Sequence, residues 1–233
     1  RQARCTCEMG GKNPVVVLAD ADLALATEGI VQGAFGSTGQ RCTATSRVVA
    51  HRGIARELTD RLVERTRALK VGNGTDPTTD IGPVVDEAPL KTVIHYIGVG
   101  KEDGATLLQG GARLTEGAHA KGHFVTPAIF GDVTPTMRIA REEVFGPVLA
   151  LLAVDSFDEA VTVANDVDYG LTSSIYANDP GAIMRFIERS EVGMVHVNSP
   201  TVGGEAQLPF GGSKATGTGW REMSEEGIHF FSE

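Results

Sequence analysis

Short runs of β-branched and other apolar residues alternate along this chain with segments of helical pattern, and this alternation limits the possible folds more than any other feature. Most of the strand-like runs are separated from the next by one or two segments of helical pattern. Strands joined through helices run parallel, and helices then cover both faces of their sheet. The sequence therefore predicts an α/β fold with a mostly parallel sheet and helices on both faces.

The expected elements can be placed along the chain. The strands share runs of apolar or β-branched residues, at 15–19, 47–50, 106–109, 123–130, 148–153 and 194–198. The helices share apolar residues at helical spacing, at 20–35, 53–69, 87–101, 136–143, 156–165 and 180–190. Asp20 or Asp22 is expected to cap the first helix. Residues 72–80 consist of turn-forming residue types and are expected to be a loop.

Composition and charge narrow the class of protein. The 233 residues are 41% hydrophobic and 22% charged, which suits a globular domain with one substantial core. The formal net charge of -9 argues against nucleic acid or an anionic membrane as the main partner, because both require a basic surface. No apolar run approaches the roughly 20 residues that span a bilayer. Three cysteines without a secretory-type N-terminus favour free thiols, and we expect a soluble, cytoplasmic protein.

Cys42 is the first candidate for chemistry. It lies in the sequence Gly39-Gln-Arg-Cys-Thr-Ala44, a small polar turn before a strand. A thiol exposed in such a turn, with backbone N–H groups near enough to lower its pKa, is a candidate nucleophile. The alternative is a half-buried thiol that packs as a small apolar residue.

Two further segments carry candidate acids. Glu8 lies just before a pair of glycines, separated from them by Met9, and at such a pair the backbone bends easily and another group can approach closely. The segment 141–148 places Glu142, Glu143 and Phe145 before a Gly-Pro turn and a buried-looking strand. The alternatives are a surface acid at Glu8 and, in the second segment, a helix end with a solvated acidic face.

Four motifs together resemble those of the aldehyde dehydrogenase superfamily, in that family's order, from Glu8 to the end of the chain. The motifs are Glu8-Met-Gly-Gly-Lys, Gly39-Gln-Arg-Cys, Glu142-Glu-Val-Phe-Gly-Pro, and Pro209-Phe-Gly-Gly-Ser-Lys with Gly217-Thr-Gly. The resemblance implies the α/β fold of the family's catalytic domain. It also implies the oxidation of an aldehyde to the acid with NAD or NADP.

The resemblance assigns roles to four of these residues. Cys42 would be the nucleophile, which forms a thiohemiacetal and then a thioester with the aldehyde. Glu8 would be the base that activates water to hydrolyse the thioester. Glu143 would accept hydrogen bonds from the nicotinamide ribose, and Phe145 would pack beside it.

Three more residues are expected at the aldehyde itself. By the same resemblance, Arg41, Thr43 and Phe210 would flank the substrate. The neighbours of Cys42 and the segment 198–210 are similar to those of members that act on polar semialdehydes, including the α-ketoglutaric semialdehyde type. Arg41 has a simpler alternative, an ion pair with a surface acid.

The resemblance also sets the expected domain organisation. Most of the coenzyme-binding domain of family members precedes the Glu8 motif, so residues 1–7 are expected to be a remnant of that domain. Residues 8–233 are expected to be the catalytic domain, truncated before a final strand that is shared between subunits. The full-length form is expected to be a homo-oligomer. Because the segment that distinguishes NAD from NADP lies outside this sequence, the cofactor is expected to be either one.

Two other functions remain open. A relative that transfers the acyl group to coenzyme A would use a thiol in place of water, although Glu8 favours water. A catalytically silent assembly or binding domain is the second. No metal site is expected, because Cys5 and Cys7 lack a second pair of ligands at zinc spacing and His119 and His123 lie in a segment of loop composition.

Overall fold

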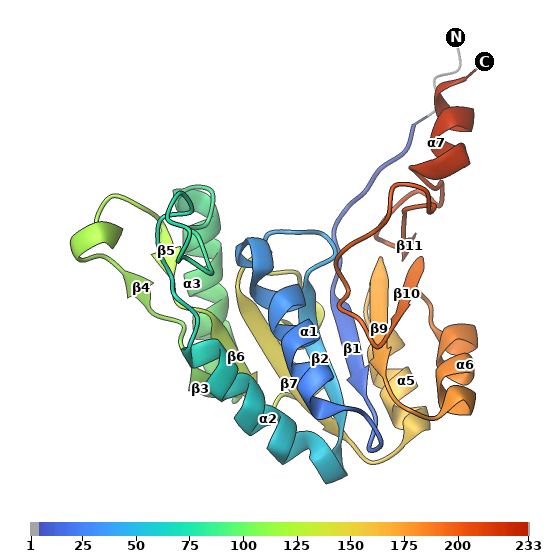
Figure 1. Ribbon diagram of the computed structural model, residues 1–233, viewed down its shortest axis with the longest axis horizontal. Coiled ribbons are helices and arrows are strands. Elements are labelled where there is room, and N and C mark those ends of the chain that lie inside the picture. The colour runs from blue at the N-terminus through green and yellow to red at the C-terminus, as the bar shows by residue number, and fades with distance from the viewer. Residues whose placement is uncertain (1–4, 233) are drawn as a thin grey trace.

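A seven-stranded sheet forms the centre of the molecule in the computed structural model, which describes residues 5–232 (Figure 1). The strand order is β10-β9-β1-β2-β7-β6-β3. Every neighbouring pair is parallel except β3 with β6, which is antiparallel at one edge of the sheet. The predicted α/β class with a mostly parallel sheet is therefore confirmed.

The elements have the following bounds. The strands of the central sheet are β1 (Asn13–Val17), β2 (Thr45–His51), β3 (Thr106–Gln109), β6 (Ala128–Gly131), β7 (Val148–Val154), β9 (Thr172–Tyr176) and β10 (Met194–Val197). Two small antiparallel sheets pair β4 (Arg113–Leu114) with β5 (Phe124–Val125), and β8 (Tyr169–Gly170) with β11 (Ser213–Lys214). The α-helices are α1 (Leu23–Phe35), α2 (Arg52–Arg67), α3 (Glu87–Glu102), α4 (Arg138–Arg141), α5 (Phe157–Asn165), α6 (Pro180–Arg189) and α7 (Ser224–Phe231). Short 3₁₀ turns, η1 and η2, occupy Gly36–Gly39 and Gly117–His119.

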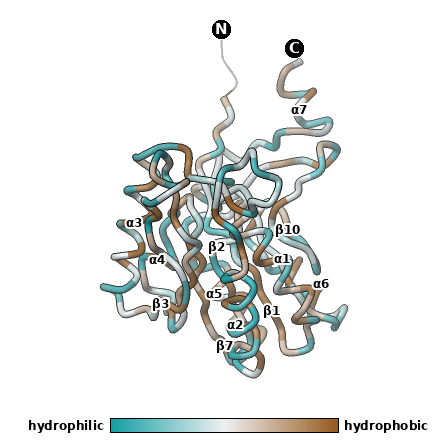
Figure 2. Tube along the Cα trace, turned by 60° about the vertical axis from the view of Figure 1, so that its left-hand side comes forward, coloured by the Kyte–Doolittle hydropathy of each residue, from teal (hydrophilic) through white to brown (hydrophobic). Residues whose placement is uncertain are grey.

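Helices cover both faces of the central sheet, and β7 shows how. Val148, Ala150 and Leu152 belong to the apolar cluster that contains residues of α3, α5 and α6. Leu149 and Leu151 belong to the cluster that contains residues of α1 and α2. Because both faces are buried, the strand is a continuous apolar run rather than an alternation of apolar and polar residues. Figure 2 shows hydrophobic stretches along β1 and β7 in the interior.

Asp22, rather than Asp20, caps α1. Its carboxylate accepts hydrogen bonds from the backbone N–H groups of Ala24 and Leu25, at 2.9 and 3.1 Å. These groups lack partners within the helix, so the cap stabilises its first turn. Asp20 instead accepts from the backbone of the turn before α6.

Two predicted elements differ in the structure. Residues 123–130 form two strands, β5 and β6, which belong to different sheets. Pro127 lies between them and has no N–H to donate to a ladder. The helix predicted at 136–143 is only α4, because the backbone is extended at Glu142. Glu143 therefore lies in an extended loop and not on a helix.

The amino ends of the parallel strands all lie at one edge of the sheet. The segment that leads into β1 and the region from β11 to α7 also lie toward this edge (Figure 1). The segments that carry Glu8, Cys42 and Glu143 precede β1, β2 and β7, so the fold brings all three to this edge. Among the described residues, no helix has the length and apolarity needed to cross a membrane.

Candidate active site

Three loops that precede neighbouring strands meet at the amino edge of the sheet. β1, β2 and β7 are consecutive in the sheet, and all are parallel. The charges of Glu8 and Glu143 both act on the Cys42 thiol. The structure therefore brings together the three residues that the sequence motifs singled out, from positions far apart in the chain.

A tight turn carries Cys42 from α1 to β2. Gly39 has a φ of +67°, which favours glycine, and a Cβ there would lie 2.6 Å from the backbone carbon of Gly146. The turn closes with a hydrogen bond from the Ala44 N–H to the Arg41 carbonyl at 3.0 Å. Cys42 is half-buried in this turn. The loop before β7 is thus packed against the loop that carries the thiol.

Burial raises the pKa of the Cys42 thiol, and the negative charges of Glu8 and Glu143 raise it further. The backbone N–H groups of Thr43 and Cys42 act in the opposite direction. As expected, these N–H groups lower the pKa of the thiol. The net shift is nevertheless upward. Burial dominates, because removing a thiolate from water costs more than two backbone dipoles return. The thiol is consequently protonated over a wider pH range than in water.

Glu8 presents a carboxylate oxygen that is buried and has no hydrogen-bond partner within residues 5–232. Its backbone forms a bridge with Gly217, and the Met9 N–H donates to the Thr216 carbonyl at 2.6 Å. Burial raises the pKa of Glu8, the charge of Glu222 raises it further, and Arg221 opposes this shift. A carboxylate with a raised pKa and a free oxygen is suited to accept a proton from water.

The two acids before β7 have different surroundings. Glu142 accepts two hydrogen bonds from Arg138, both at 2.9 Å, and one from the Tyr96 hydroxyl at 2.6 Å; these bonds lower its pKa to about 2. Glu143 accepts a single bond, from the Gly11 N–H to Oε1 at 3.0 Å. Burial raises the pKa of Glu143, whereas that bond and the charge of Lys12 lower it. Glu142 is committed to structural contacts, and Glu143 keeps acceptor capacity for a ligand.

Phe145 projects from the same loop in a conformation that bulky residues rarely adopt. Its φ is 53°, and its side chain is 44% exposed. A small hollow of about 20 Å³ adjoins it, lined also by Gly11, Arg41 and Glu143. An acceptor carboxylate beside an exposed aromatic ring fits the ribose and ring of a nicotinamide nucleotide, which present hydroxyl donors and a flat face.

The structure places the three predicted substrate residues as follows. Arg41 is exposed and lines the hollow beside Phe145. The Thr43 side chain is buried, and the Thr43 carbonyl accepts a hydrogen bond from the Thr201 hydroxyl at 2.7 Å. Phe210 pairs through its backbone with Glu222, whose charge acts on Glu8. Each of the three is thus connected to the loops of Cys42 or Glu8.

Three residues of this region were not predicted from the sequence. Asn13 and Thr201 bind the carbonyls of the Cys42 turn, and Glu222 acts electrostatically on Glu8. The sequence did contain a signal for Asn13. An asparagine at the start of an apolar strand lies either at an exposed strand end or in the interior, where its amide must form hydrogen bonds. Thr201 and Glu222 lie in loops far along the chain, where only the fold brings them to the site.

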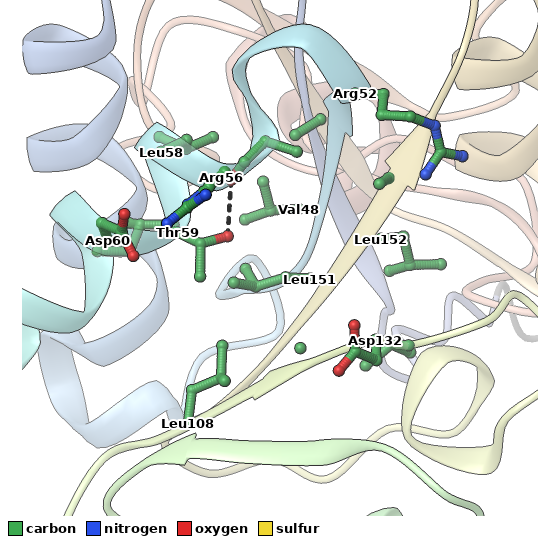
Figure 3. Close-up of a pocket in the computed structure, with 16 residues that line it drawn as sticks. Val48, Arg52, Arg56, Leu58, Thr59, Asp60, Leu108, Asp132, Leu151 and Leu152 are labelled. Atoms are coloured by element: carbon green, nitrogen blue, oxygen red, sulfur yellow. Dashed lines mark hydrogen bonds between the residues drawn. The ribbon is translucent and has the colours of Figure 1, made fainter.

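A separate cavity of about 460 Å³ lies between α2 and the sheet, toward the carboxyl ends of β2 and β7 (Figure 3). Leucines 58, 108, 151 and 152 line it, with Arg52, Arg56, Asp60 and Asp132. Arg52 forms an ion pair with Asp155 and is not free for a ligand. None of the predicted site residues lines this cavity. The chemistry that the sequence predicts therefore belongs to the opposite edge of the sheet.

The described part of the chain, residues 5–232, holds no group of three His, Cys, Asp or Glu side chains arranged to bind a metal ion. The Sγ atoms of Cys5 and Cys7 are 3.8 Å apart. The Nε2 atom of His119 is 2.9 Å from the Val71 carbonyl. The Nδ1 atom of His123 is buried and has no hydrogen-bond partner among the described residues.

The fold and the site together define a class of protein. The model of the aldehyde dehydrogenase family matches residues 1–233, and the chain belongs to this family. Among curated relatives, it is 44% identical over 232 residues to the alpha-ketoglutaric semialdehyde dehydrogenase of Bacillus subtilis, and 46% identical over 232 residues to the 2,5-dioxopentanoate dehydrogenase of Saccharolobus solfataricus. These alignments cover 100% and 99% of this chain but 48% of each relative. The chain thus spans about half the length of these relatives.

Solved structures of similar fold belong to the same family. The betaine aldehyde dehydrogenase of Staphylococcus aureus, in complex with NAD+, has a TM-score of 0.93 at 35% identity, covering 96% of this chain and 44% of that one. An NAD-dependent aldehyde dehydrogenase of Sinorhizobium meliloti has a TM-score of 0.93 at 38% identity, covering 98% and 44%. The α/β fold of this chain is therefore that of about half of each structure.

Proposed function

We propose that this chain is the catalytic part of a longer NAD- or NADP-dependent aldehyde dehydrogenase that oxidises a polar semialdehyde to the carboxylic acid. The single observation that carries the proposal is that the loops of Glu8, Cys42 and Glu143 meet at the amino ends of three neighbouring strands, where the segment after Glu8 forms hydrogen bonds with both Glu143 and the Cys42 carbonyl. One acid is suited to proton transfer and the other to ligand binding. The family, and the fact that the chain spans about half of its relatives, support the assignment to one part of a larger protein.

Cys42 provides the nucleophile. The thiol first gives its proton to water, and the thiolate then adds to the carbonyl carbon of the aldehyde, forming a C–S bond and placing the electron pair of the C=O π bond on oxygen. Backbone N–H groups of the Cys42 turn are available to stabilise this oxyanion. When the oxyanion collapses, the aldehyde hydrogen leaves with its electron pair, and Cys42 is left as a thioester.

Glu8 completes the reaction. Its free oxygen accepts a proton from a water molecule, whose oxygen attacks the thioester carbonyl; the C–S bond breaks and the acid is released. The raised pKa of Glu8 makes it a stronger base than an exposed glutamate. A transfer to coenzyme A would not need this base, so the buried free oxygen of Glu8 favours hydrolysis.

Glu143 and Phe145 would hold the nicotinamide end of the coenzyme, which supplies the hydride acceptor when bound. Glu143 is positioned by the Gly11 N–H and retains a second oxygen for the ribose hydroxyls. Phe145 presents its ring beside this carboxylate. The part of a coenzyme site that would distinguish NAD from NADP is not among these residues, and we propose either coenzyme.

The substrate class follows from the relatives and from Arg41. The two curated relatives named above are an alpha-ketoglutaric semialdehyde dehydrogenase and a 2,5-dioxopentanoate dehydrogenase. Arg41 is exposed beside the hollow and is in no ion pair within the described residues. Its guanidinium suits the carboxylate of a semialdehyde acid. Thr43 and Phe210 would complete the walls of the substrate site.

A substrate screen of the full-length protein tests the proposal. We expect turnover with an α-keto semialdehyde acid that exceeds turnover with an apolar aldehyde of similar length, with NAD or NADP as acceptor. Replacing Arg41 by methionine should raise KM for the acid substrate and leave the apolar one unchanged. No turnover with any aldehyde, together with a Cys42 no more reactive than Cys5 and Cys7, would instead support a silent binding domain.

A further inference from the structure

We propose that Asn13 is a positioning residue for Cys42, acting through the peptide group between Cys42 and Thr43. This inference rests on the proposed role of Cys42 as the nucleophile. The Asn13 side chain lies at the start of β1, is 2% exposed, and belongs to the strand that the Glu8 loop enters. No motif role was assigned to it.

Asn13 uses its whole side-chain amide. Its Nδ2 donates to the Cys42 carbonyl at 2.7 Å and to the Ala44 carbonyl at 2.8 Å. Its Oδ1 accepts from the Thr172 N–H at 3.3 Å, at the start of β9. A buried amide with both N–H donors and its oxygen engaged has one orientation, so it holds the two carbonyls at fixed positions.

The geometry of the peptide group connects the hydrogen bonds of Asn13 to the sulfur of Cys42. The Cys42 carbonyl and the Thr43 N–H belong to one planar peptide group, in which they point in opposite directions. The Thr43 N–H lowers the pKa of the Cys42 thiol. When Asn13 fixes the carbonyl, it therefore also fixes the N–H that stabilises the thiolate. Thr201 restrains the next peptide in the same way through the Thr43 carbonyl.

Gly11 supplies an independent observation. A Cβ on Gly11 would lie 2.8 Å from Asn13 Oδ1 and 2.9 Å from the Cys42 carbonyl oxygen. Both distances are shorter than side-chain carbons tolerate, so only a glycine allows the amide and the carbonyl to meet there. The backbone of Gly11 has an ordinary φ, so this need for glycine arises from the close approach alone. The Gly11 N–H also holds Glu143, which connects the Cys42 turn to the proposed coenzyme site.

The test measures the pH profile of Cys42 alkylation by iodoacetamide in the full-length protein, with Cys5 and Cys7 replaced by serine throughout. Asn13→Leu removes both donors without adding charge, and we expect the midpoint of the profile to rise and the rate at neutral pH to fall by about tenfold. Asn13→Ser retains one donor, and the midpoint of its profile should lie between those of the wild type and Asn13→Leu. Gly11→Ala should shift the profile in the same direction as Asn13→Leu.

Asn198→Leu is the matched control. Asn198 also bonds a backbone N–H and carbonyl, those of Ala177, but it follows β10 and thus lies at the other edge of the sheet. Its variant should lose stability without shifting the Cys42 profile. Circular dichroism establishes that each variant is folded, and Gly11→Ala and Asn13→Ser decide the question if Asn13→Leu does not fold.

The possible outcomes separate the two proposals. A wild-type Cys42 that iodoacetamide fails to alkylate even at alkaline pH, where the raised pKa of the thiol no longer limits the reaction, overturns the proposed function and this inference with it. A reactive wild-type Cys42 whose profile is unchanged in folded Asn13 and Gly11 variants overturns the inference alone. An equal shift in Asn198→Leu would show a general loss of stability, and it would overturn the inference as well.

Discussion

Gly10 lies directly against the carboxylate of Glu143. A Cβ on Gly10 would be 2.9 Å from the Glu143 Cδ atom, and the φ of Gly10 is +96°, a region that other residues rarely adopt. The next residue, Gly11, donates its N–H to the same carboxylate. The glycine pair after Glu8 thus acts as a cradle for Glu143, the acid that we assign to the coenzyme.

Gly10→Ala should therefore weaken coenzyme binding. The added methyl group displaces the Glu143 carboxylate, and we expect KM for NAD or NADP in the full-length protein to rise by about tenfold, the equivalent of one charge-assisted hydrogen bond. Steady-state rates at varied coenzyme concentration measure this effect. Gly74→Ala is the control, because a Cβ there meets nothing within 4 Å. An unchanged KM in Gly10→Ala would remove Glu143 from the coenzyme site.

Cys42→Ala should abolish aldehyde oxidation in the full-length protein, because no covalent intermediate can form. Cys5→Ala should keep full activity, since Cys5 is exposed and lies in a different segment. Mass spectrometry after brief exposure to aldehyde and coenzyme should detect an acyl adduct on Cys42 in the wild type only. Normal rates in Cys42→Ala would exclude the proposed mechanism.

Glu8→Gln should separate acylation from hydrolysis. The first turnover should produce reduced coenzyme at a normal rate, while the steady-state rate falls by about a hundredfold, the usual contribution of a general base. The experiment is a stopped-flow measurement of the burst. Adding coenzyme A in parallel, with analysis of the products, distinguishes hydrolysis from acyl transfer. Acyl-coenzyme A as the main product in the wild type would support the coenzyme A-dependent alternative.

The raised pKa of Glu8 adds a pH dependence to this step. Glu8 acts as a base only when ionised, and burial raises its pKa above the ordinary 4.5. The rate of thioester hydrolysis should consequently fall as the pH is lowered through that raised pKa, starting at a higher pH than for an exposed glutamate. The residual hydrolysis in Glu8→Gln should lack this dependence. A profile with the same acidic limb in both proteins would assign the base to another residue.

Lys12 should make the stability of the chain depend on pH. It is 2% exposed, and burial lowers its pKa from 10.5 to about 7. Between these two values the unfolded state binds the proton and the native state does not, so stability rises with pH across this window. In urea unfolding at several pH values, the free energy of unfolding of wild type relative to Lys12→Met should rise from pH 7 to 10. A constant difference would contradict a buried, neutral lysine.

Arg47 connects the start of β1 with the end of α5. Its guanidinium, 1% exposed, donates to the carbonyls of Lys12, Val163 and Ala164 at 2.8 to 3.0 Å. Arg47→Met leaves three buried carbonyls without partners, and we expect the free energy of unfolding to fall by about 3 kcal/mol. Arg67→Met, at an exposed position late in α2, should change it by less than about 0.5 kcal/mol. Chemical denaturation measures both variants.

The sequence predicts the elements that bury apolar runs. β7, with its seven mostly apolar residues, and β1 are recognisable because both of their faces are covered. The strand β9 (Thr172–Tyr176) was not predicted, because four of its five residues carry hydroxyl groups. It is fully buried in the sheet, and its backbone pairing rather than its hydrophobicity defines it. α7 was also missed, since none of its residues is buried.

The residues of the candidate site also divide into those that the sequence predicts and those that only the fold reveals. Cys42, Glu8, Glu143 and Phe145 were predicted because they lie in short motifs of the sequence, and their roles remain proposals. Asn13 escaped prediction because its value lies in three hydrogen bonds to distant backbone groups, which no local pattern encodes. The net pKa shift of Cys42 was likewise inaccessible, since it depends on the extent of burial and on charges from other loops.

The loops that carry Glu8, Cys42 and Glu143 all lie at the amino ends of the strands. The two edges of the sheet therefore differ in how far their sequence can be altered without affecting the proposed reaction. The segment after β10 returns to the site with Thr201 and Phe210, but the other turns that follow the parallel strands contribute no group to the proposed reaction. Lengthening such a turn, or attaching a probe to it, alters the rim farthest from the sulfur. Turns at the carboxyl ends of the strands can therefore be engineered separately from the reaction centre at the amino ends, although both belong to the same sheet.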